Sequence, residues 1–269
     1  MITATANDLK NFRICELLYE YRSGSEKVEY IHPRFQRQLD FENTIKKIAS
    51  FFFYKKQAYA EPSYQALLNR WQKLWFSAET TAMDLTTAQH EIMWDNESSY
   101  TNQAAMALLE FYEDFANKTD TQVILSNESF TVPFGKDVVL SGSFDLVLRT
   151  KNPLGDKYTI YKWSGYQKRM TMESWMFDFA ILNYAFAYRN DFKPLDVDFK
   201  LWNFGSIKPG PVHYELSDDD KKALKFWTDR LVSTEVFVPK RGLIAYCKQC
   251  PFDEMCSKWR FPITIDQNK

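Results

Sequence analysis

Three cysteines near the end of the chain are the residues whose spacing most directly suggests chemistry. Cys247, Cys250 and Cys256 form a C-x2-C-x5-C pattern, and Cys15 is the only other cysteine. Thiolates at such short spacing are able to hold Zn²⁺ or an iron–sulfur cluster, because several soft sulfur ligands can converge on one centre. A site built from all four thiolates would join the two ends of the protein.

Two other interpretations of the cysteines are a disulfide pair and buried free thiols. The first residues, Met1-Ile2-Thr3-Ala4, lack the charged and apolar regions of a signal peptide. We therefore expect a cytoplasmic protein, of cellular or viral origin, whose thiols stay reduced. This context favours a metal or cluster site, while the spacing alone leaves both zinc and iron–sulfur open.

A second pattern with chemical meaning lies in the middle of the chain. Residues 124–132, 139–147 and 158–162 resemble the core hairpins of the RecB-like branch of the PD-(D/E)XK nucleases. In that family one strand ends in Gly-x-x-Asp and the next carries an acid-x-Lys; here Asp145 and Lys162 fill the last position of each motif. The resemblance implies carboxylates that hold Mg²⁺ or Mn²⁺ against a phosphate, and a lysine that orients the attacking water.

The cysteine arrangement is similar to that of the iron–sulfur branch of this family, which includes the AddB nuclease domain and the CRISPR-associated RecB-like nucleases. The likeness extends over residues 12–259. It implies that Cys15, Cys247, Cys250 and Cys256 bind a [4Fe-4S] cluster, with zinc as the alternative.

The sequence departs from the family pattern at three positions of the expected nuclease site. Ile160 stands where the acid of acid-x-Lys belongs, which removes a ligand oxygen and a negative charge. Lys46 stands where a histidine is expected, and a lysine ammonium does not ligate a metal. Ala180 replaces a glutamine, although the tyrosine of the same Gln-x-x-x-Tyr motif remains as Tyr184.

A displaced acid is able to restore such a site, and three acids are candidates: Glu128, Glu173 and Asp178. Two functions from different classes follow. The favoured one is a catalytically degenerate relative that serves as a DNA-binding, recombination-accessory or structural assembly subunit. The alternative is an active Mg²⁺- or Mn²⁺-dependent DNA exonuclease or endonuclease that uses Asp145, Lys162 and one displaced acid.

The composition limits how the chain contacts partners. The formal net charge of -1 gives no global signature of nucleic-acid binding, so any DNA contact must be local. No apolar run approaches the roughly 20 residues of a membrane span. The run Phe51-Phe52-Phe53-Tyr54 cannot bury all four rings on one helix face, so we expect at least one ring to meet another lobe, another chain or nucleic acid.

Hydrophobic periodicity and turn residues predict one α/β domain over residues 1–269, with a PD-(D/E)XK-like mixed sheet flanked by helices. An N-terminal helical lobe is expected at 39–118, and a cysteine segment at 240–269 that packs on the first helix. We expect that first helix to be continuous to about residue 19, with Asn7 or Asp8 as its N-cap. Further helices are expected at 39–55, 63–76, 98–117, 172–189 and 217–232, and strands at 123–125, 129–133, 138–150, 157–163, 197–204 and 212–216.

Overall fold

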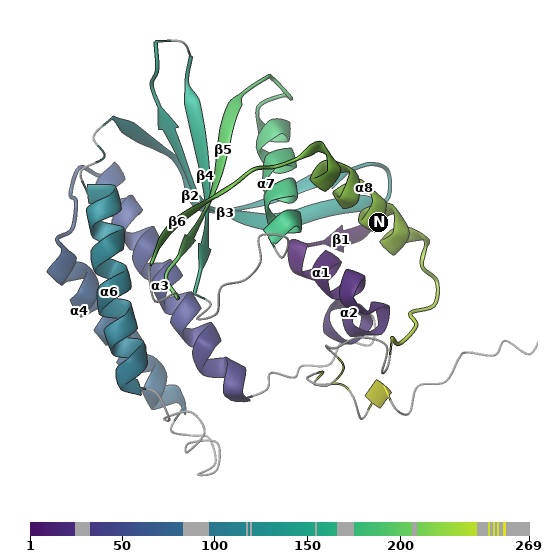
Figure 1. Ribbon diagram of the computed structural model, residues 1–269, viewed down its shortest axis with the longest axis horizontal. Coiled ribbons are helices and arrows are strands. Elements are labelled where there is room, and N and C mark those ends of the chain that lie inside the picture. Colours follow the sequence, from purple (N-terminus) through teal and green to yellow (C-terminus); the bar gives the residue numbers. More distant parts are fainter. Residues whose placement is uncertain are drawn as a thin grey trace, which may run out of the picture.

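The chain folds around one mixed six-stranded sheet with helices on both of its faces (Figure 1). This computed structural model describes residues 1–24, 33–82, 97–116, 118, 120–153, 155–165, 175–205, 209–240, 247, 250, 252, 255 and 256. The elements are β1 (Ile2–Ala4), α1 (Ala6–Ile14), α2 (Glu16–Ser23), α3 (Pro33–Gln57), α4 (Tyr64–Ala82), α6 (Glu97–Ala116), β2 (Thr121–Phe134), β3 (Val138–Thr150), β4 (Lys157–Ser164), α7 (Met176–Arg189), β5 (Asp196–Asn203), β6 (Gly210–Tyr214) and α8 (Asp218–Ser233).

Strand β3 organises the sheet, because it pairs with three other strands. On one edge β2 runs antiparallel to it along nearly its whole length. On the other edge the partner changes: β1 pairs in parallel with residues 138–140, and β4 pairs antiparallel with residues 146–150. Residues 141–145 of β3 lie between these two partners. The sheet continues from β4 to β5 in parallel and from β5 to β6 antiparallel.

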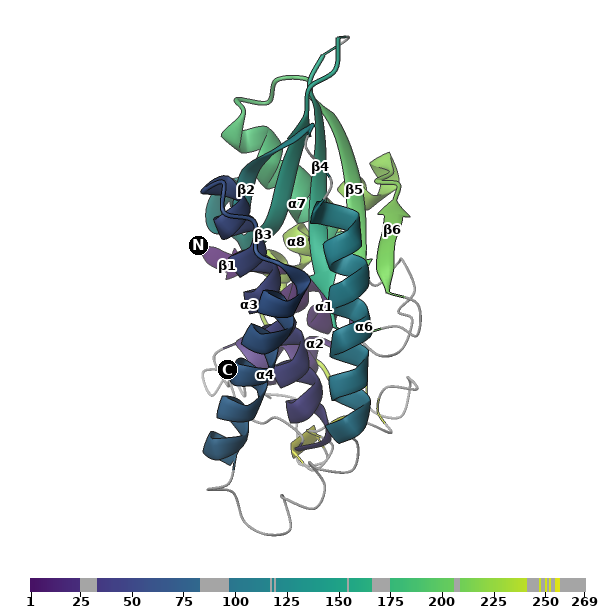
Figure 2. The same cartoon turned by 90° about the vertical axis from the view of Figure 1, so that its left-hand side faces the viewer.

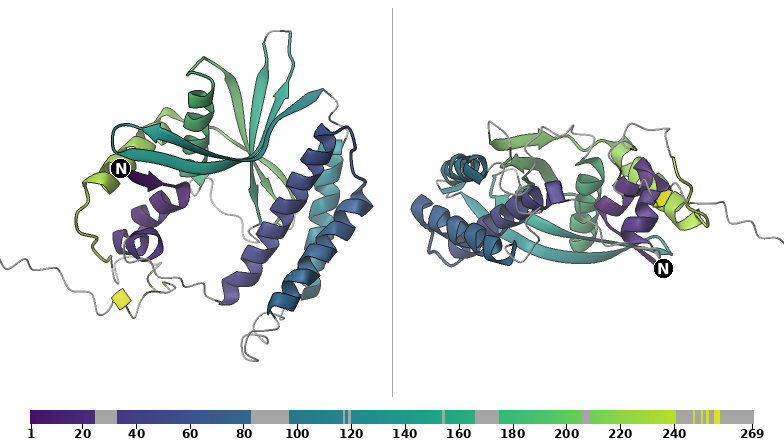
Figure 3. Two further views of the ribbon diagram at one scale, coloured as in Figure 1. Left: turned by 180° about the vertical axis from the view of Figure 1, so that it is seen from behind. Right: turned by 90° about the horizontal axis from the view of Figure 1, so that it is seen from below.

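Side chains on the two faces of the sheet belong to two separate cores. Ile160, Phe199 and Leu201 contribute to the core beneath α1, α7 and α8. Trp163 and Trp202 contribute to the core beneath α3, α4 and α6. Figure 1 and Figure 3 show these two groups of helices on opposite sides of the strands. The alternation follows from the period of two residues along a strand.

The lobe of α3, α4 and α6 is packed largely by aromatic rings, and Figure 2 shows its three helices side by side. Phe111 of α6 is fully buried, and its ring contacts Phe53 of α3, Trp163 of β4 and Trp202 of β5. Such ring pairs add stabilisation beyond the area they bury. The lobe is therefore joined to the sheet by a continuous aromatic core.

The four rings of the aromatic run in α3 are not all buried, as the sequence predicts. Phe52 and Phe53 are buried, Phe51 is half-buried, and Tyr54 is 66% exposed. Tyr59, just after the helix, is fully exposed and has a positive φ of 55°. Two tyrosine rings near the C-terminal end of α3 therefore face solvent.

The structure corrects several sequence expectations. The first helix is not continuous, since Cys15 adopts an extended backbone that separates α1 from α2. Its N-cap is Thr5, which forms a capping box with Asp8, rather than Asn7 or Asp8. The two short strands expected at 123–125 and 129–133 are one strand, β2, and β1 was not expected because three residues carry too little pattern.

The remaining elements agree with expectation to within a few residues, apart from longer helices α3 and α4. Helix α7 begins at Met176, and residues 172–174 of its expected range lie outside the described residues. Ser217 caps α8 with its own capping box, as its acidic first turn predicts. Within the described ranges, none of the helices has the length and apolar composition that a membrane crossing requires.

Candidate functional site

The Asp145 carboxylate lies where β3 exchanges one partner strand for another. The ladder between β3 and β4 ends at Leu146 and Tyr161, so the next backbone groups of β4 have no β3 backbone partner in that register. Asp145 Oδ2 accepts a hydrogen bond from the backbone N–H of Trp163 at 2.8 Å. Because the residue is only 6% exposed, this bond serves a carboxylate that has little access to water.

Lys162 provides the charge that Asp145 requires. Its Nζ lies 3.4 Å from Asp145 Oδ2, and both side chains are largely buried. Burial opposes the ammonium, but the carboxylates of Asp145, Asp178 and Glu42 outweigh it and raise the pKa of Lys162. The lysine is therefore positively charged at neutral pH and lies within the field of three acids from three elements.

Each of these three acids also has a lysine partner. Glu42 of α3 pairs with Lys46 one turn further along, at 2.6 Å. Asp178 of α7 pairs with Lys10 of α1. Among the described residues, these two pairs and the Asp145–Lys162 pair supply three carboxylates and three ammonium groups, which we call the carboxylate–lysine cluster.

Glu42 reaches this cluster because α3 lies directly against the end of β4. A Cβ added to Gly165 would come within 2.8 Å of the Glu42 Cα. Only a residue without a side chain fits such a close approach. Gly165 thus fixes the helix of the lobe against the strand that carries Lys162.

A pocket of about 380 Å³ opens beside the cluster. It lies along the part of β3 between its two partner strands, and Ser141 and Ser143 line it. Lys162 and Asp178 line the same pocket, as does Thr5 at the start of α1. The pocket therefore offers hydroxyl groups, one cation and one anion to a small polar group.

The other candidate site residues lie elsewhere. Glu128 on β2 is exposed and pairs with Arg189. Tyr184 donates a hydrogen bond from its hydroxyl to the carbonyl oxygen of Pro133 at 2.9 Å and packs on Phe134, at the hairpin end of β2. Glu173 lies outside the described residues. Of the three displaced acids considered, the structure brings Asp178 to Lys162.

Sequence reasoning missed Glu42 and Lys10. Glu42 stands four residues before Lys46 on a helix, a spacing typical of a surface ion pair, so nothing local distinguishes it. Lys10 pairs with a residue 168 positions away in sequence. Gly165 could have indicated that another element packs here, because a glycine that follows a buried strand often marks a close approach of the backbone. That element is α3, which carries Glu42.

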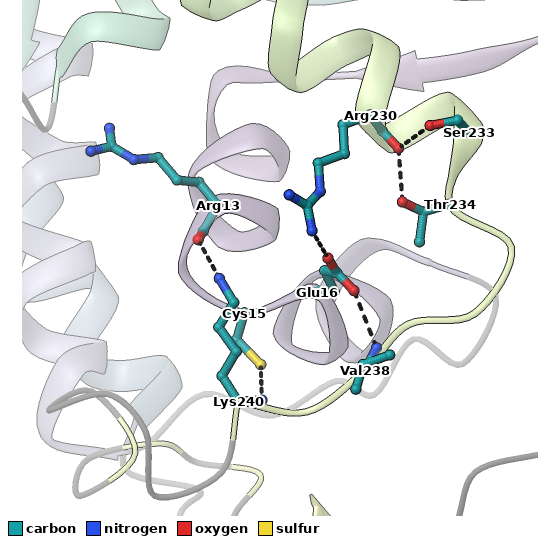
Figure 4. A network of polar contacts seen from close by, with 8 residues as sticks. All are labelled: Arg13, Cys15, Glu16, Arg230, Ser233, Thr234, Val238 and Lys240. Atoms are coloured by element: carbon teal, nitrogen blue, oxygen red, sulfur yellow. Dashed lines mark hydrogen bonds and ion pairs between the residues drawn. The ribbon is translucent and has the colours of Figure 1, made fainter.

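The cysteines lie at the C-terminal end of α1, whereas the pocket beside the cluster lies at its N-terminal end, near Thr5. Cys15 lies between α1 and α2, and its Sγ accepts a hydrogen bond from the backbone N–H of Lys240 at 3.5 Å (Figure 4). Cys247 donates from its Sγ to the carbonyl oxygen of Lys240 at 3.3 Å. One residue after α8 therefore contacts both the N-terminal cysteine and the first cysteine of the C-terminal group.

Polar contacts hold this segment in place on α1 and α2. Glu16 accepts from Arg230 at 2.7 Å and from the backbone N–H of Val238 at 3.4 Å (Figure 4). Lys240 donates from its side chain to the carbonyl oxygen of Arg13 at 3.0 Å. The chain leaving α8 is thus fixed across the helix break at Cys15.

Apolar packing brings the remaining cysteines to the same place. Cys15, Cys250 and Cys256 pack against a small core that includes Phe252 and Tyr21. Burial raises the pKa of Cys250, and the neighbouring Cys15 and Cys247 add to this shift. Thiols are the donor type that suits a thiolate-bound metal or cluster. Across the described ranges, however, no three His, Cys, Asp or Glu side chains form a group ready to hold a metal ion.

We predict that Asp145→Asn lowers the free energy of unfolding by about 3 kcal/mol, because a buried lysine loses its opposite charge. Lys162→Met in the Asp145→Asn background should recover most of this loss. Chemical denaturation of the wild type, both single variants and the double variant measures the coupling.

Glu128→Gln is the matched control: its ion pair is exposed, so the substitution should lower the free energy of unfolding by at most about 0.5 kcal/mol. Additive effects of Asp145→Asn and Lys162→Met would contradict the pairing.

No family model matches the chain, and no curated protein matches it either. Among solved structures, the chain is similar to the crystal structure of SSO0001, with a TM-score of 0.38 and 11% sequence identity. The alignment covers 96% of this chain and 87% of that chain. A likeness this distant adds no argument to the geometry of the cluster, the pocket and the cysteines.

Proposed function

We propose that this protein is a catalytically degenerate member of the RecB-like PD-(D/E)XK nucleases that binds DNA as a recombination-accessory or assembly subunit. The observation that carries the proposal is the carboxylate–lysine cluster. A nuclease of this class uses carboxylates to hold divalent cations against the phosphate. Here Asp145, Asp178 and Glu42 are each opposed by a lysine instead.

The residues present do not fit a Mg²⁺ or Mn²⁺ centre. A hard divalent cation requires several oxygen ligands, and at least one of them is absent because Ile160 replaces the acid two residues before Lys162. Ile160 is buried in the core on the α7 side of the sheet. Of the candidate acids that the structure describes, Asp178 lies nearest to Lys162, but Lys10 already pairs with it.

An active nuclease is the second candidate, and one observation favours it. Asp178 and Lys162 line the same pocket, and Asp145 lies 3.4 Å from Lys162. In this alternative Asp145 and Asp178 hold Mg²⁺ or Mn²⁺ and Lys162 orients the attacking water.

Exposed tyrosines support a local DNA contact. Tyr54 and Tyr59 face solvent at the end of α3, and Lys55 lies within 6.0 Å of the Tyr54 ring centre. Tyr59 also lines an open pocket of about 730 Å³ together with Lys56 and Lys118. Aromatic rings beside basic groups bind single strands by stacking on bases, without a globally basic surface.

The cysteine site is proposed to hold a [4Fe-4S] cluster through Cys15, Cys247, Cys250 and Cys256, with zinc as the alternative. Such a cluster would act as a structural clasp, because its ligands come from both ends of the described chain. A crosslink that closes so long a loop restricts the unfolded chain and couples folding to metal binding.

The nuclease question has a direct test: labelled single- and double-stranded DNA incubated with Mg²⁺ or Mn²⁺ and the full chain. We expect no more degradation than with Asp145→Ala or with a chelator. Divalent-dependent cleavage that Asp145→Ala abolishes would refute the degenerate site. If Asp178→Asn abolished the same cleavage, Asp178 would be the displaced acid.

The DNA contact is tested by fluorescence anisotropy with a labelled single strand. Tyr54→Ala and Tyr59→Ala should each weaken binding about tenfold, since stacking of one base contributes about 1–3 kcal/mol. Tyr188→Ala, which removes a 42% exposed tyrosine from α7, is the control and should leave the affinity unchanged. Equal effects of all three substitutions would contradict a binding surface at α3.

The clasp predicts about four irons per chain in protein purified without oxygen, together with a brown colour. Cys15→Ser should lower the iron content and the free energy of unfolding together, because one ligand of the clasp is lost. Metal analysis and chemical denaturation measure both quantities. Stoichiometric zinc without iron would select the zinc alternative, and unchanged metal content in Cys15→Ser would exclude an N-to-C clasp.

A further inference from the structure

We infer that the pocket of about 730 Å³ at the end of α3 binds one unstacked nucleobase of a single strand, with Tyr59 as its stacking platform. The inference rests on the DNA contact of the proposed function, and it names the part of the nucleic acid that this pocket recognises. The walls come from the end of α3, the end of α6 and the start of β2. Pockets for small groups commonly measure about 300–1,000 Å³.

Tyr59 occupies a backbone position that favours glycine. Its N–H donates to the carbonyl oxygen of Lys56 at 3.1 Å, and the N–H of Ala60 donates to that of Lys55 at 3.0 Å. These two bonds form the Schellman motif that ends α3. The φ of 55° at Tyr59 lies in the left-handed region, where a residue with a Cβ is strained and glycine is not. A glycine would therefore end the helix with less strain.

The exposure of the Tyr59 ring shows that packing does not offset this strain. The residue is fully exposed, so its ring buries no apolar area against the protein. Because it also lines the pocket, the ring lies at the pocket mouth. Strained residues are found preferentially at ligand-binding and active sites. We therefore interpret the Tyr59 ring as a group that contacts a ligand.

The charges around the pocket favour a neutral ligand over a phosphate. Lys56 pairs with Glu61 at 3.4 Å and also donates to the carbonyl oxygen of Ala116 at 3.3 Å. Lys118 pairs with Asp114 at 2.7 Å. Both lysines that line the pocket within the described ranges are thus opposed by carboxylates, which leaves little net attraction for an anion. A flat, neutral and polar base fits this lining better.

Gln122 supplies the pocket with a hydrogen-bond donor of fixed direction. Its Oε1 accepts a hydrogen bond from the guanidinium of Arg149. Since arginine has donors only, this contact fixes which way the Gln122 amide is turned. Its Nε2 is then the end of the amide that can donate to a ligand in the pocket. The carbonyl oxygens of thymine and guanine accept such a bond.

The test compares two end-labelled strands of equal length, oligothymidine and an abasic strand, by fluorescence anisotropy with the full chain at low salt. The abasic strand keeps every phosphate but has no base. We expect the wild type to bind oligothymidine at least about tenfold more tightly than the abasic strand. Tyr59→Gly should weaken oligothymidine binding about tenfold and leave abasic binding unchanged. Its melting temperature should be at least that of the wild type, because glycine relieves the strain.

A second variant tests the donor. Gln122→Glu keeps an acceptor for Arg149 but removes the N–H groups, so it should weaken oligothymidine binding about fivefold. Gln65→Glu is the matched control for the added negative charge. Gln65 bonds to Asn69 on the exposed surface of α4, outside the pocket lining, and its substitution should leave the affinity unchanged.

Three results would overturn the inference. Equal losses of Tyr59→Gly on both strands would mean that the ring contacts the backbone of the strand, and the DNA contact would stand without a base pocket. A lower melting temperature of Tyr59→Gly would mean that the ring supports the fold; Tyr59→Asn, which also tolerates positive φ, repeats this test if Tyr59→Gly does not fold. If the wild type bound neither strand, the DNA contact of the proposed function would fail as well.

Discussion

The buried carboxylate of Asp145 makes two interactions on which the rest of the structure depends: a hydrogen bond within the sheet and an ion pair with Lys162. The sheet requires an acceptor for the Trp163 N–H, because β3 changes its pairing partner from β1 to β4 at this point. The site requires a negative charge beside the ammonium of Lys162, which burial would otherwise destabilise. Trp163 in turn belongs to the aromatic core of the lobe. The same side chain therefore connects the strand order, the lobe and the charged site.

This double role offers a physical reason for the presence of Asp145 and Lys162 that does not depend on catalysis. A carboxylate that only held a metal could be replaced at little structural cost, and Ile160, at the position where the resemblance predicts an acid, is buried in the core. Asp145 is different, because its removal would take from a buried lysine the carboxylate that pairs with it. Tyr184 has a similar explanation: its hydroxyl bonds to Pro133 at the hairpin end of β2, a structural contact distant from the cluster.

The sequence predicts those parts of the fold and site that depend on local patterns. The order of helices and strands follows from hydrophobic periodicity, and the Asp145–Lys162 contact follows from a hairpin in which the two motifs are close in the chain. The break at Cys15 was not predictable from periodicity, because residues on both sides favour a helix. Glu42 and Lys10 reach the cluster through tertiary packing of α3 and α1, which no local pattern reports.

Helix α1 carries Lys10 and ends at Cys15, and this short distance has an evolutionary consequence. Five residues of helix, from Lys10 to Ile14, span about 7.5 Å, so Lys10 and the adjoining Cys15 are connected by one rigid segment. A substitution that tilts or shifts α1 to suit one end displaces the other. Selection that acts only on the cysteines would therefore also hold Lys10 against Asp178. A single helix thus couples the geometry of two distant groups, so neither can vary independently of the other.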